Sequence, residues 1–227
     1  MASFDDIYRQ TITLFYHKVE NGVTTWYPFV IDGVHLIMDK AIIISTYGEQ
    51  SQDNAKVHIR YIPSSGGAVV KGKTYMLPKQ FARDGDPESN FTLGVGDAFD
   101  FIMEGVFSEE SLSASVSKNT LSVSVDAVQW KKTALAETGT YVFTYDGVSW
   151  TYGGVVVDLA AYGISVTGAP EENDKITVKY VSPSGPIADA DYRNGFYNYM
   201  NKHYDNVFAI STVSKFNLIP HFEIGAK

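Results

Sequence analysis

The chain of 227 residues contains no cysteine. Disulfides and thiolate metal sites are therefore excluded, and the fold has to rest on packing and hydrogen bonds. No apolar run approaches the roughly 20 residues that a membrane-spanning helix needs. The opening MASFDDIYRQ carries acidic residues and no apolar stretch typical of an export signal. We therefore expect a protein that is neither exported nor inserted into a membrane.

Basic residues are scarce. Lys and Arg number 18 against 26 Asp and Glu, which gives a formal net charge of -8. Binding to a nucleic-acid backbone without regard to sequence depends on clustered cations that release counterions, so the charge balance argues against stable wrapping of DNA. With 44% hydrophobic and 14% aromatic residues, the chain has enough apolar surface to form a core, and we predict that it folds.

The commonest catalytic signatures are also missing. There is no Gly-x-Ser-x-Gly elbow and no phosphate-binding Gly-Lys-Ser/Thr loop. The pair Gly94 and Gly96 lacks the third glycine and the following helix of a dinucleotide site. Paired carboxylates for glycoside cleavage stay open, because their separation in space is what defines them. We predict that the protein is not an enzyme and uses no cofactor.

Three groups of side chains have the chemistry for binding, and for each the sequence favours a simpler interpretation. No paired ligand spacing such as His-Glu-x-x-His occurs among the histidines, so we predict no metal site; they stand at positions 17, 35, 58, 203 and 221. The acidic loop 83–89 lacks the full ligand series of a calcium loop and is predicted to be solvated. Aromatic residues in strand patterns are more typical of packing than of stacking on sugars or bases; these are Trp26, Tyr27, Trp130 and Trp150.

Most of the sequence that is present predicts β-strands. Asn21-Gly22 is typical of a tight primed turn and predicts an antiparallel hairpin over residues 8–31. The apolar residues Val57, Ile59 and Tyr61 alternate with their neighbours and predict a half-buried strand. Residues 63–75, PSSGGAVVKGKTY, are interpreted as a glycine-rich flexible loop that enters another strand.

One helix is predicted within residues 188–205, ADADYRNGFYNYMNKHYD. Apolar and aromatic residues recur there at intervals of three and four: Tyr192, Phe196, Tyr199, Met200 and His203. Asp189 or Asp191 is placed to cap its N-terminus. Gly195 would cost about 1 kcal/mol relative to alanine inside such a helix. The helix is therefore expected to depend on docking its aromatic face.

The middle of the chain differs from both ends. Residues 111–185 are rich in Ser, Thr and Val, and turn signals such as Asp146-Gly147 recur at the spacing of a small β-sandwich. The segments on either side can form one continuous domain. We therefore predict a β-barrel-like host domain of residues 1–110 and 186–227, with one short helix, interrupted by an inserted β domain of residues 111–185.

Several stretches resemble a known family. They are TLFYHKVENGVTTWYPFVIDGVHL, YMLPKQF, FDFIMEGVF and the closing YDNVFAISTVSKFNLIPHFEIGAK. Together they are similar to small virion proteins of tailed bacteriophages, the head-completion or head-tail joining (neck) proteins. The resemblance covers about residues 10–110 and 186–227. The segment 137–180 resembles an Ig-like β module found in several phage structural proteins.

The resemblance implies a structural virion protein, assembled in the cytoplasm of the host bacterium. Its β-barrel subunits would form a homo-oligomeric ring, a hexamer or dodecamer, between the portal or adaptor and the tail. Packaged DNA would pass the channel without sequence-specific binding, and the acidic net charge favours a lining that repels it. The insertion is expected to project outward. Partner contacts are expected at loops of the host domain. The candidate contact residues are Ser64, Gly67, Lys71, Lys73, Pro220, His221 and Phe222.

Two other functions stay open. One is a tail terminator, also a ring, whose contacts would be with the tail tube. The other is a capsid or tail decoration protein whose inserted β domain binds carbohydrate. The second alternative predicts exposed aromatic residues around one end of the insertion.

Overall fold

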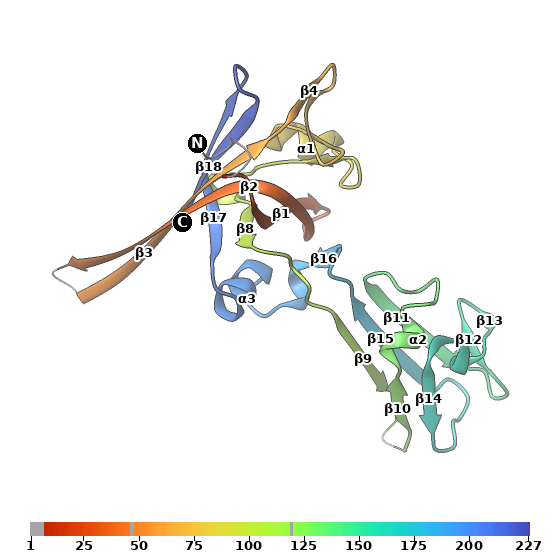
Figure 1. Ribbon diagram of the computed structural model, residues 1–227. Helices are drawn as coiled ribbons and strands as arrows, with labels where there is room; N and C mark the ends of the chain where they lie inside the picture. The colour runs from red at the N-terminus through yellow and green to blue at the C-terminus, as the bar shows by residue number, and fades with distance from the viewer. Residues whose placement is uncertain (1–6, 46–47, 119) are drawn as a thin grey trace. The chain divides into compact units, whose positions relative to one another are not determined.

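The computed structural model describes residues 7–45, 48–118 and 120–227, and for residues 39–45 and 48–53 the backbone alone. The chain forms two compact units (Figure 1). One comprises the residues up to Phe107 together with Ile187–Lys227, and the other is Ser108–Pro186. These boundaries lie close to those predicted at 110 and 186. The predicted mainly-β, barrel-like fold class is confirmed.

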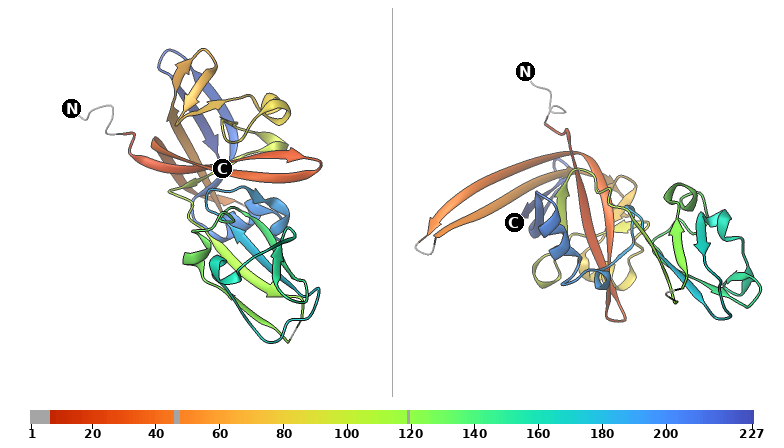
Figure 2. Two further views of the ribbon diagram at one scale, coloured as in Figure 1. Left: turned by 90° about the vertical axis from the view of Figure 1, so that its right-hand side faces the viewer. Right: turned by 90° about the horizontal axis from the view of Figure 1, so that it is seen from below.

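The first unit is a closed barrel of six antiparallel strands. Around the barrel the order is β1 (Gln10–Glu20), β8 (Phe101–Glu104), β17 (Val207–Phe216), β18 (His221–Ala226), β3 (Gly48–Arg60) and β2 (Val23–Ser45), and β2 pairs again with β1. The short strand β16 (Ile187–Ala188) adds to β2 at Trp26. Figure 2 shows the barrel from two further sides. Closure of this kind leaves the six strands without a free sheet edge inside the barrel.

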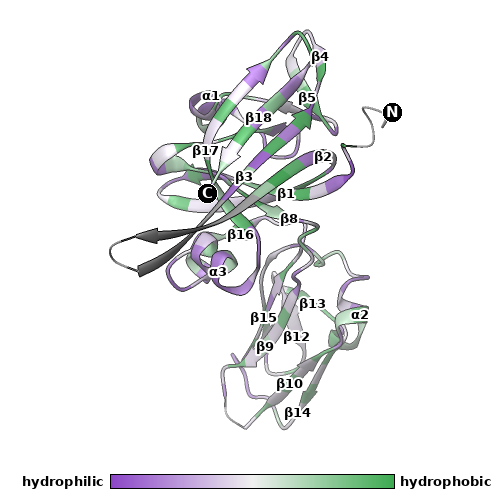
Figure 3. Ribbon diagram, turned by 60° about the vertical axis from the view of Figure 1, so that its left-hand side comes forward, coloured by the Kyte–Doolittle hydropathy of each residue, from purple (hydrophilic) through white to green (hydrophobic). Residues whose placement is uncertain are grey.

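The predicted hairpin over residues 8–31 is confirmed as β1 and the first half of β2. Asn21 and Gly22 have φ angles of 51° and 78°, the positive values that a primed turn requires. The turn aligns Glu20 with Val23 and sets the register of the whole ladder. Hydrophobic and hydrophilic residues alternate along the barrel strands (Figure 3). The predicted strand around Val57 and Ile59 is confirmed within β3, where both side chains are buried.

Strand β1 is buried on both faces. Leu14 and Tyr16 lie in the barrel core, while Phe15 belongs to a second aromatic cluster on the outside of the strand. The ring of Phe15 stacks on Phe101 at 4.6 Å and meets Phe196 edge-on at 5.5 Å. Phe196 begins the helix α3 (Phe196–His203), so the helix docks through its aromatic face as predicted.

The predicted start of this helix was wrong. Residues 189–191 form a separate single turn, η4 (Asp189–Asp191), and α3 begins only at Phe196. Gly195 precedes the helix at φ +88°, a conformation that other residues rarely adopt, so this glycine is required there. Asp189 Oδ1 accepts a hydrogen bond from the Phe196 backbone N–H at 2.8 Å and another from Trp26 Nε1 at 2.8 Å. Asp189 therefore caps the helix from seven positions earlier in the chain, and its second hydrogen bond connects the start of the helix to β2.

The predicted flexible loop at residues 63–75 was also wrong. The segment contains β4 (Ile62–Ser64), β5 (Gly67–Val70) and β6 (Lys73–Tyr75), which lead to α1 (Pro78–Asp84) and β7 (Asn90–Phe91). Ala68 and Val70 are buried in the barrel core cluster. The glycines at 66, 67 and 72 lie at tight turns between short strands. Glycine-rich sequence is thus compatible with tight turns as well as with a flexible loop.

The second unit is a small β-sandwich. One sheet has the order β13 (Val155–Val156), β12 (Trp150–Tyr152), β11 (Gly139–Tyr145), β15 (Lys175–Val181) and β9 (Ser111–Val116), and the other pairs β10 (Ser122–Val125) with β14 (Ile164–Thr167). Trp130, at the end of the short helix α2 (Ala127–Trp130), is fully buried with Phe143 and Ile176 in the core. The η3 turn (Leu159–Tyr162) precedes β14.

A buried carboxylate fixes the start of β8. Asp100 is fully buried and accepts hydrogen bonds from the backbone N–H of Gly94 at 2.5 Å and of His17 at 3.1 Å, while His17 Nδ1 lies 2.8 Å away. Burial raises the pKa of the Asp100 carboxyl, and these hydrogen bonds act in the opposite direction. The side chain therefore joins β1 to the loop before β8 within the barrel unit.

We expect Asp100→Asn to lower the free energy of unfolding by about 2 kcal/mol. One carboxylate oxygen becomes an NH₂ group, so either the Gly94 or the His17 N–H loses its acceptor in a buried site. The exposed Asp97, in the turn η2 (Gly96–Ala98), is the matched control, and Asp97→Asn should change stability by less than about 0.5 kcal/mol. Urea denaturation measures the stability of both variants. Equal losses of stability would contradict the role of Asp100 in joining β1 to the loop before β8.

Candidate functional site

The first group of predicted contact residues lies on the β4–β6 meander. Ser64 and Lys71 are exposed; Ser64 Oγ donates a hydrogen bond to the Gly67 carbonyl at 3.1 Å, and Lys71 forms an ion pair with Asp32. Lys73 is half-buried and points inward, since its Nζ donates to Tyr16 Oη at 2.9 Å and to the Pro87 carbonyl at 2.5 Å.

Burial lowers the pKa of the Lys73 ammonium. Its hydrogen bonds to Tyr16 and Pro87 link parts of the barrel unit. Of the other predicted contact residues in this group, Ser64 and Lys71 are exposed and Gly67 is half-buried.

The second predicted group lies at the start of β18. Pro220 and His221 are half-buried, whereas Phe222 is fully buried and packs on Tyr61 and Tyr75 at ring distances of 5.1 and 4.8 Å. As a correction, the Phe222 side chain belongs to the barrel core and not to a contact surface. Phe222 lies on the inward face of β18, and its neighbours in the strand, His221 and Glu223, face outward.

An exposed apolar turn, not singled out from the sequence, lies beside that group. Phe216 is the last residue of β17, and Leu218 and Ile219 lie in the turn that leads to β18. Their exposed fractions are 44%, 98% and 55%. We call residues 216–219 the apolar turn. Its signal in the sequence is FNLIP, in which hydrophobic residues occupy a turn that polar residues normally fill. Turns of this composition are candidates for contact with another protein.

A long two-stranded arm is the second candidate surface. Strands β2 and β3 pair continuously from Val34 and Ile59 to Ser45 and Gly48. On the outer sides, β1 pairs with β2 only as far as Val34, and β18 pairs with β3 only over residues 55–60. We call residues 39–45 with 48–54 the arm. In the part of the chain that the structure describes, the arm has no third strand, and it extends beyond the barrel (Figure 2).

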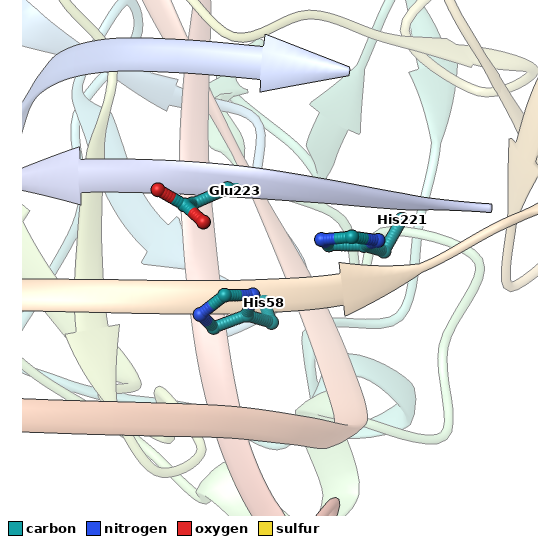
Figure 4. Close-up of side chains that lie close together, drawn as sticks. All are labelled: His58, His221 and Glu223. Atoms are coloured by element: carbon teal, nitrogen blue, oxygen red, sulfur yellow. The ribbon is translucent and has the colours of Figure 1, made fainter. Parts of the chain in front are cut away.

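Four polar side chains form a cluster on the outside of the barrel. The cross-strand register places His35 beside His58 and His58 beside Glu223, with His221 two residues before Glu223 on β18. Since the alternate residues of these strands are buried in the barrel core, this row faces outward. Figure 4 shows His58, His221 and Glu223 lying close together on the neighbouring strands.

The geometry of this cluster is compact. One ligand atom each of His58, His221 and Glu223 can be chosen so that all three lie within 4.8 Å of one another, and the two imidazole rings are stacked at 5.5 Å. Lys56 Nζ lies 3.2 Å from Glu223 Oε1. Burial lowers the pKa of the His58 imidazole, and the Glu223 carboxylate opposes this shift.

The histidine spacings predict no metal site, because ligand pairs such as His-Glu-x-x-His are typical of helices and this cluster lies on strands. In a strand, ligands that share a face stand two residues apart, and His221-Phe222-Glu223 has that spacing. The third member, His58, is 163 residues away in the chain (221 minus 58). Its position is set by the β3–β18 register, which the sequence does not specify.

The other groups considered above have structural partners. Asp86 closes a turn by accepting hydrogen bonds from Ser89 Oγ at 2.7 Å and the Glu88 N–H at 3.1 Å. Trp26 and Trp130 are buried, in line with the packing interpretation. Every aromatic residue in the described part of the second unit, residues 108–118 and 120–186, is buried or half-buried. The exposed aromatic residues that a carbohydrate-binding insertion predicts are not found in those residues.

Within the described ranges, no helix has the length and apolar character needed to span a membrane.

Comparison with known proteins gives one finding. The model of a family described as "Family of unknown function (DUF6751)" matches residues 7–141. The match runs from β1 through β8 and into the second unit as far as β11. No curated protein matches the chain, and no solved structure matches it.

Proposed function

We propose a structural function for this chain, which belongs to the Family of unknown function (DUF6751). In this proposal it is the subunit of a homo-oligomeric ring, a hexamer or dodecamer, at the head-tail interface of a tailed-phage virion. The ring lies between the portal or adaptor and the tail and performs no chemistry. The resemblance of the barrel segments to neck proteins supports the setting, and the arm supports the assembly.

The arm is the observation that carries the proposal. In the described backbone the arm is a ribbon of two strands without a third, and an isolated two-stranded ribbon is marginally stable in water. Among the described residues no strand pairs with its two outer edges, and unpaired edges of this kind are a template for pairing with another chain. The sequence of its first strand contains Ile42-Ile43-Ile44, a run typical of strands covered on both faces. These features are expected of a segment that is completed by a neighbouring subunit.

Such a contact leads to a ring when each subunit extends its arm onto the next. The arm and the surface that receives it are different patches, so the contact is heterologous, and heterologous contacts close into rings when the rotation between copies allows it. The apolar turn provides a further surface of the same unit, with Leu218 almost fully exposed. Burying its hydrophobic side chains between subunits would add to the stability of the ring.

We expect Leu218→Asp to weaken ring assembly by at least about tenfold, because a carboxylate would then be buried without a partner in the interface. The stability of the subunit should change by less than about 0.5 kcal/mol, since Leu218 is 98% exposed. Val148→Asp is the matched control, at a position 84% exposed in the second unit. Concentration-dependent mass measurement by light scattering compares them, and equal assembly of all three proteins would rule out the apolar turn as a contact.

The location is tested by counting copies in the particle. Virions of a phage that encodes the chain are purified, and labelled peptides quantify the chain relative to the major capsid protein. We expect the copy number of one hexameric or dodecameric ring, and we expect the chain in tailless heads from a tail-defective mutant. A copy number near that of the capsid protein would indicate decoration, and presence in free tails but not in heads would indicate a tail terminator.

A further inference from the structure

We propose that His58, His221 and Glu223 bind a divalent transition-metal ion of the Zn²⁺ type on the outside of the barrel. The inference rests on the positions of these three side chains and does not depend on the ring. Two imidazoles and one carboxylate form one of the ligand sets that proteins use for zinc with one coordination position left open.

The ligands are held by a rigid scaffold. His221 and Glu223 share one face of β18, and the antiparallel register aligns Glu223 directly with His58 on β3. The neighbours Val57, Phe222 and Ile224 are fully buried in the barrel core and fix both backbones. Sites built on packed strands vary little in geometry, which lowers the cost of bringing the ligands together.

The distances fit a metal after small side-chain rotations. The chosen ligand atoms lie within 4.8 Å of one another. Bonds of about 2.0–2.1 Å in a tetrahedral site place ligand atoms about 3.3 Å apart. We expect side-chain rotations to close this difference while the paired strands keep their register.

The hydrogen bond of the His221 ring also fits a ligand. Its Nδ1 lies 2.7 Å from the Ile219 carbonyl oxygen, which can only accept a hydrogen bond, so Nδ1 carries the proton. In this tautomer the lone pair of the ring is on Nε2. A carbonyl that fixes the tautomer and orientation of a ligating histidine in this way is the usual outer-shell partner in metal sites.

Lys56 would compete with a metal ion for Glu223. Its ammonium lies 3.2 Å from Glu223 Oε1, and its side chain is 52% exposed, so it can move into solvent when a metal binds. A competing positive charge at this distance weakens the site. We therefore expect Lys56→Met to raise the affinity for Zn²⁺ by about threefold or more.

Binding would add a link between the already paired strands β18 and β3. This link would lie beside the apolar turn, since the His221 ring stacks on Phe216 at 4.8 Å. The open position would hold water or a donor group from another molecule. Ca²⁺ and Mg²⁺ prefer sets of oxygen ligands, so this site should discriminate against both ions.

The test uses the full chain, stripped with a chelator and then dialysed. Zn²⁺ is titrated in competition with a chromophoric chelator, and Co²⁺ is used to record the visible spectrum. We expect one ion per chain with a Kd of about 1 μM or tighter, together with the intense visible bands of four-coordinate cobalt. His58→Ala, His221→Ala and Glu223→Gln should each weaken binding at least about tenfold, because each removes one of three ligands.

Two matched variants make the outcome decisive. His203→Ala removes an exposed histidine whose ring lies 4.4 Å from that of Tyr199, and it should leave the Kd unchanged. His35→Ala removes a ring stacked on His58 at 5.6 Å but outside the three-ligand set, and should change the Kd by less than about threefold. Thermal melting of the metal-free proteins checks that each variant is folded. Binding that survives the loss of His58 and His221, or that is weaker than about 100 μM in the parent chain, would overturn the proposal.

Discussion

Removing the arm is expected to abolish ring formation and to leave a folded, monomeric barrel. The change replaces residues 39–54 with Asn-Gly, which joins Met38 directly to its ladder partner Ala55 through a two-residue primed turn. The barrel should survive because its closure uses only the proximal parts of β2 and β3, where β1 and β18 pair with them. Native mass spectrometry reports the oligomeric state, and circular dichroism reports the fold.

The control for this experiment is an excision of another large segment. Residues 108–186 form the second compact unit, and replacing them with a short Gly-Ser linker should leave ring assembly intact, because the proposed contacts lie in the barrel unit. A chain without the arm that still assembles to the parental mass would show that the arm is not the contact. Loss of the ring on excision of the second unit alone would count against the division of labour between the units.

Phe222→Ala should lower the stability of the barrel unit by about 3–5 kcal/mol. Phe222 is fully buried, and its ring lies 5.1 Å from Tyr61, 4.8 Å from Tyr75 and 6.3 Å from Phe91. Truncation would leave a cavity that these aromatic side chains cannot close by small movements. Hydrogen exchange in a urea series, read by mass spectrometry, follows the two units separately, and protection in residues 108–186 should not change.

The neighbouring Phe216 provides the comparison. It is 44% exposed at the end of β17, and Phe216→Ala should cost less than about 1 kcal/mol. The two substitutions remove the same ring only six residues apart in sequence (222 minus 216). Similar losses of stability would contradict the assignment of Phe222 to the core and restore it as a surface contact.

The sequence predicted best where local signals agree. Asn21-Gly22 defines a turn by its backbone requirement, and the alternation of buried residues around it fixes the register of the first hairpin. The helix near the C-terminus was recognised from its aromatic spacing, but its start was not. Gly195 was interpreted as a helical residue, whereas its positive φ places it before the first turn.

Prediction failed where the outcome depends on distant parts of the chain. The glycines of residues 63–75 are compatible both with a flexible loop and with tight turns, and the burial of Ala68 and Val70 in the barrel core selects the turns. The histidine cluster depends on the pairing of β3 with β18, strands separated by most of the chain. The arm escaped notice because a strand pattern does not reveal whether a third strand is beside it.

The most direct test of the central claim is an electron cryo-microscopy reconstruction of the neck of a virion that contains the chain. We predict a ring of density between the portal or adaptor and the tail, fitted by the six-stranded barrel, with the arm of each subunit lying against the next subunit. Density for the barrel on the capsid surface or along the tail, with none at the neck, would contradict the account.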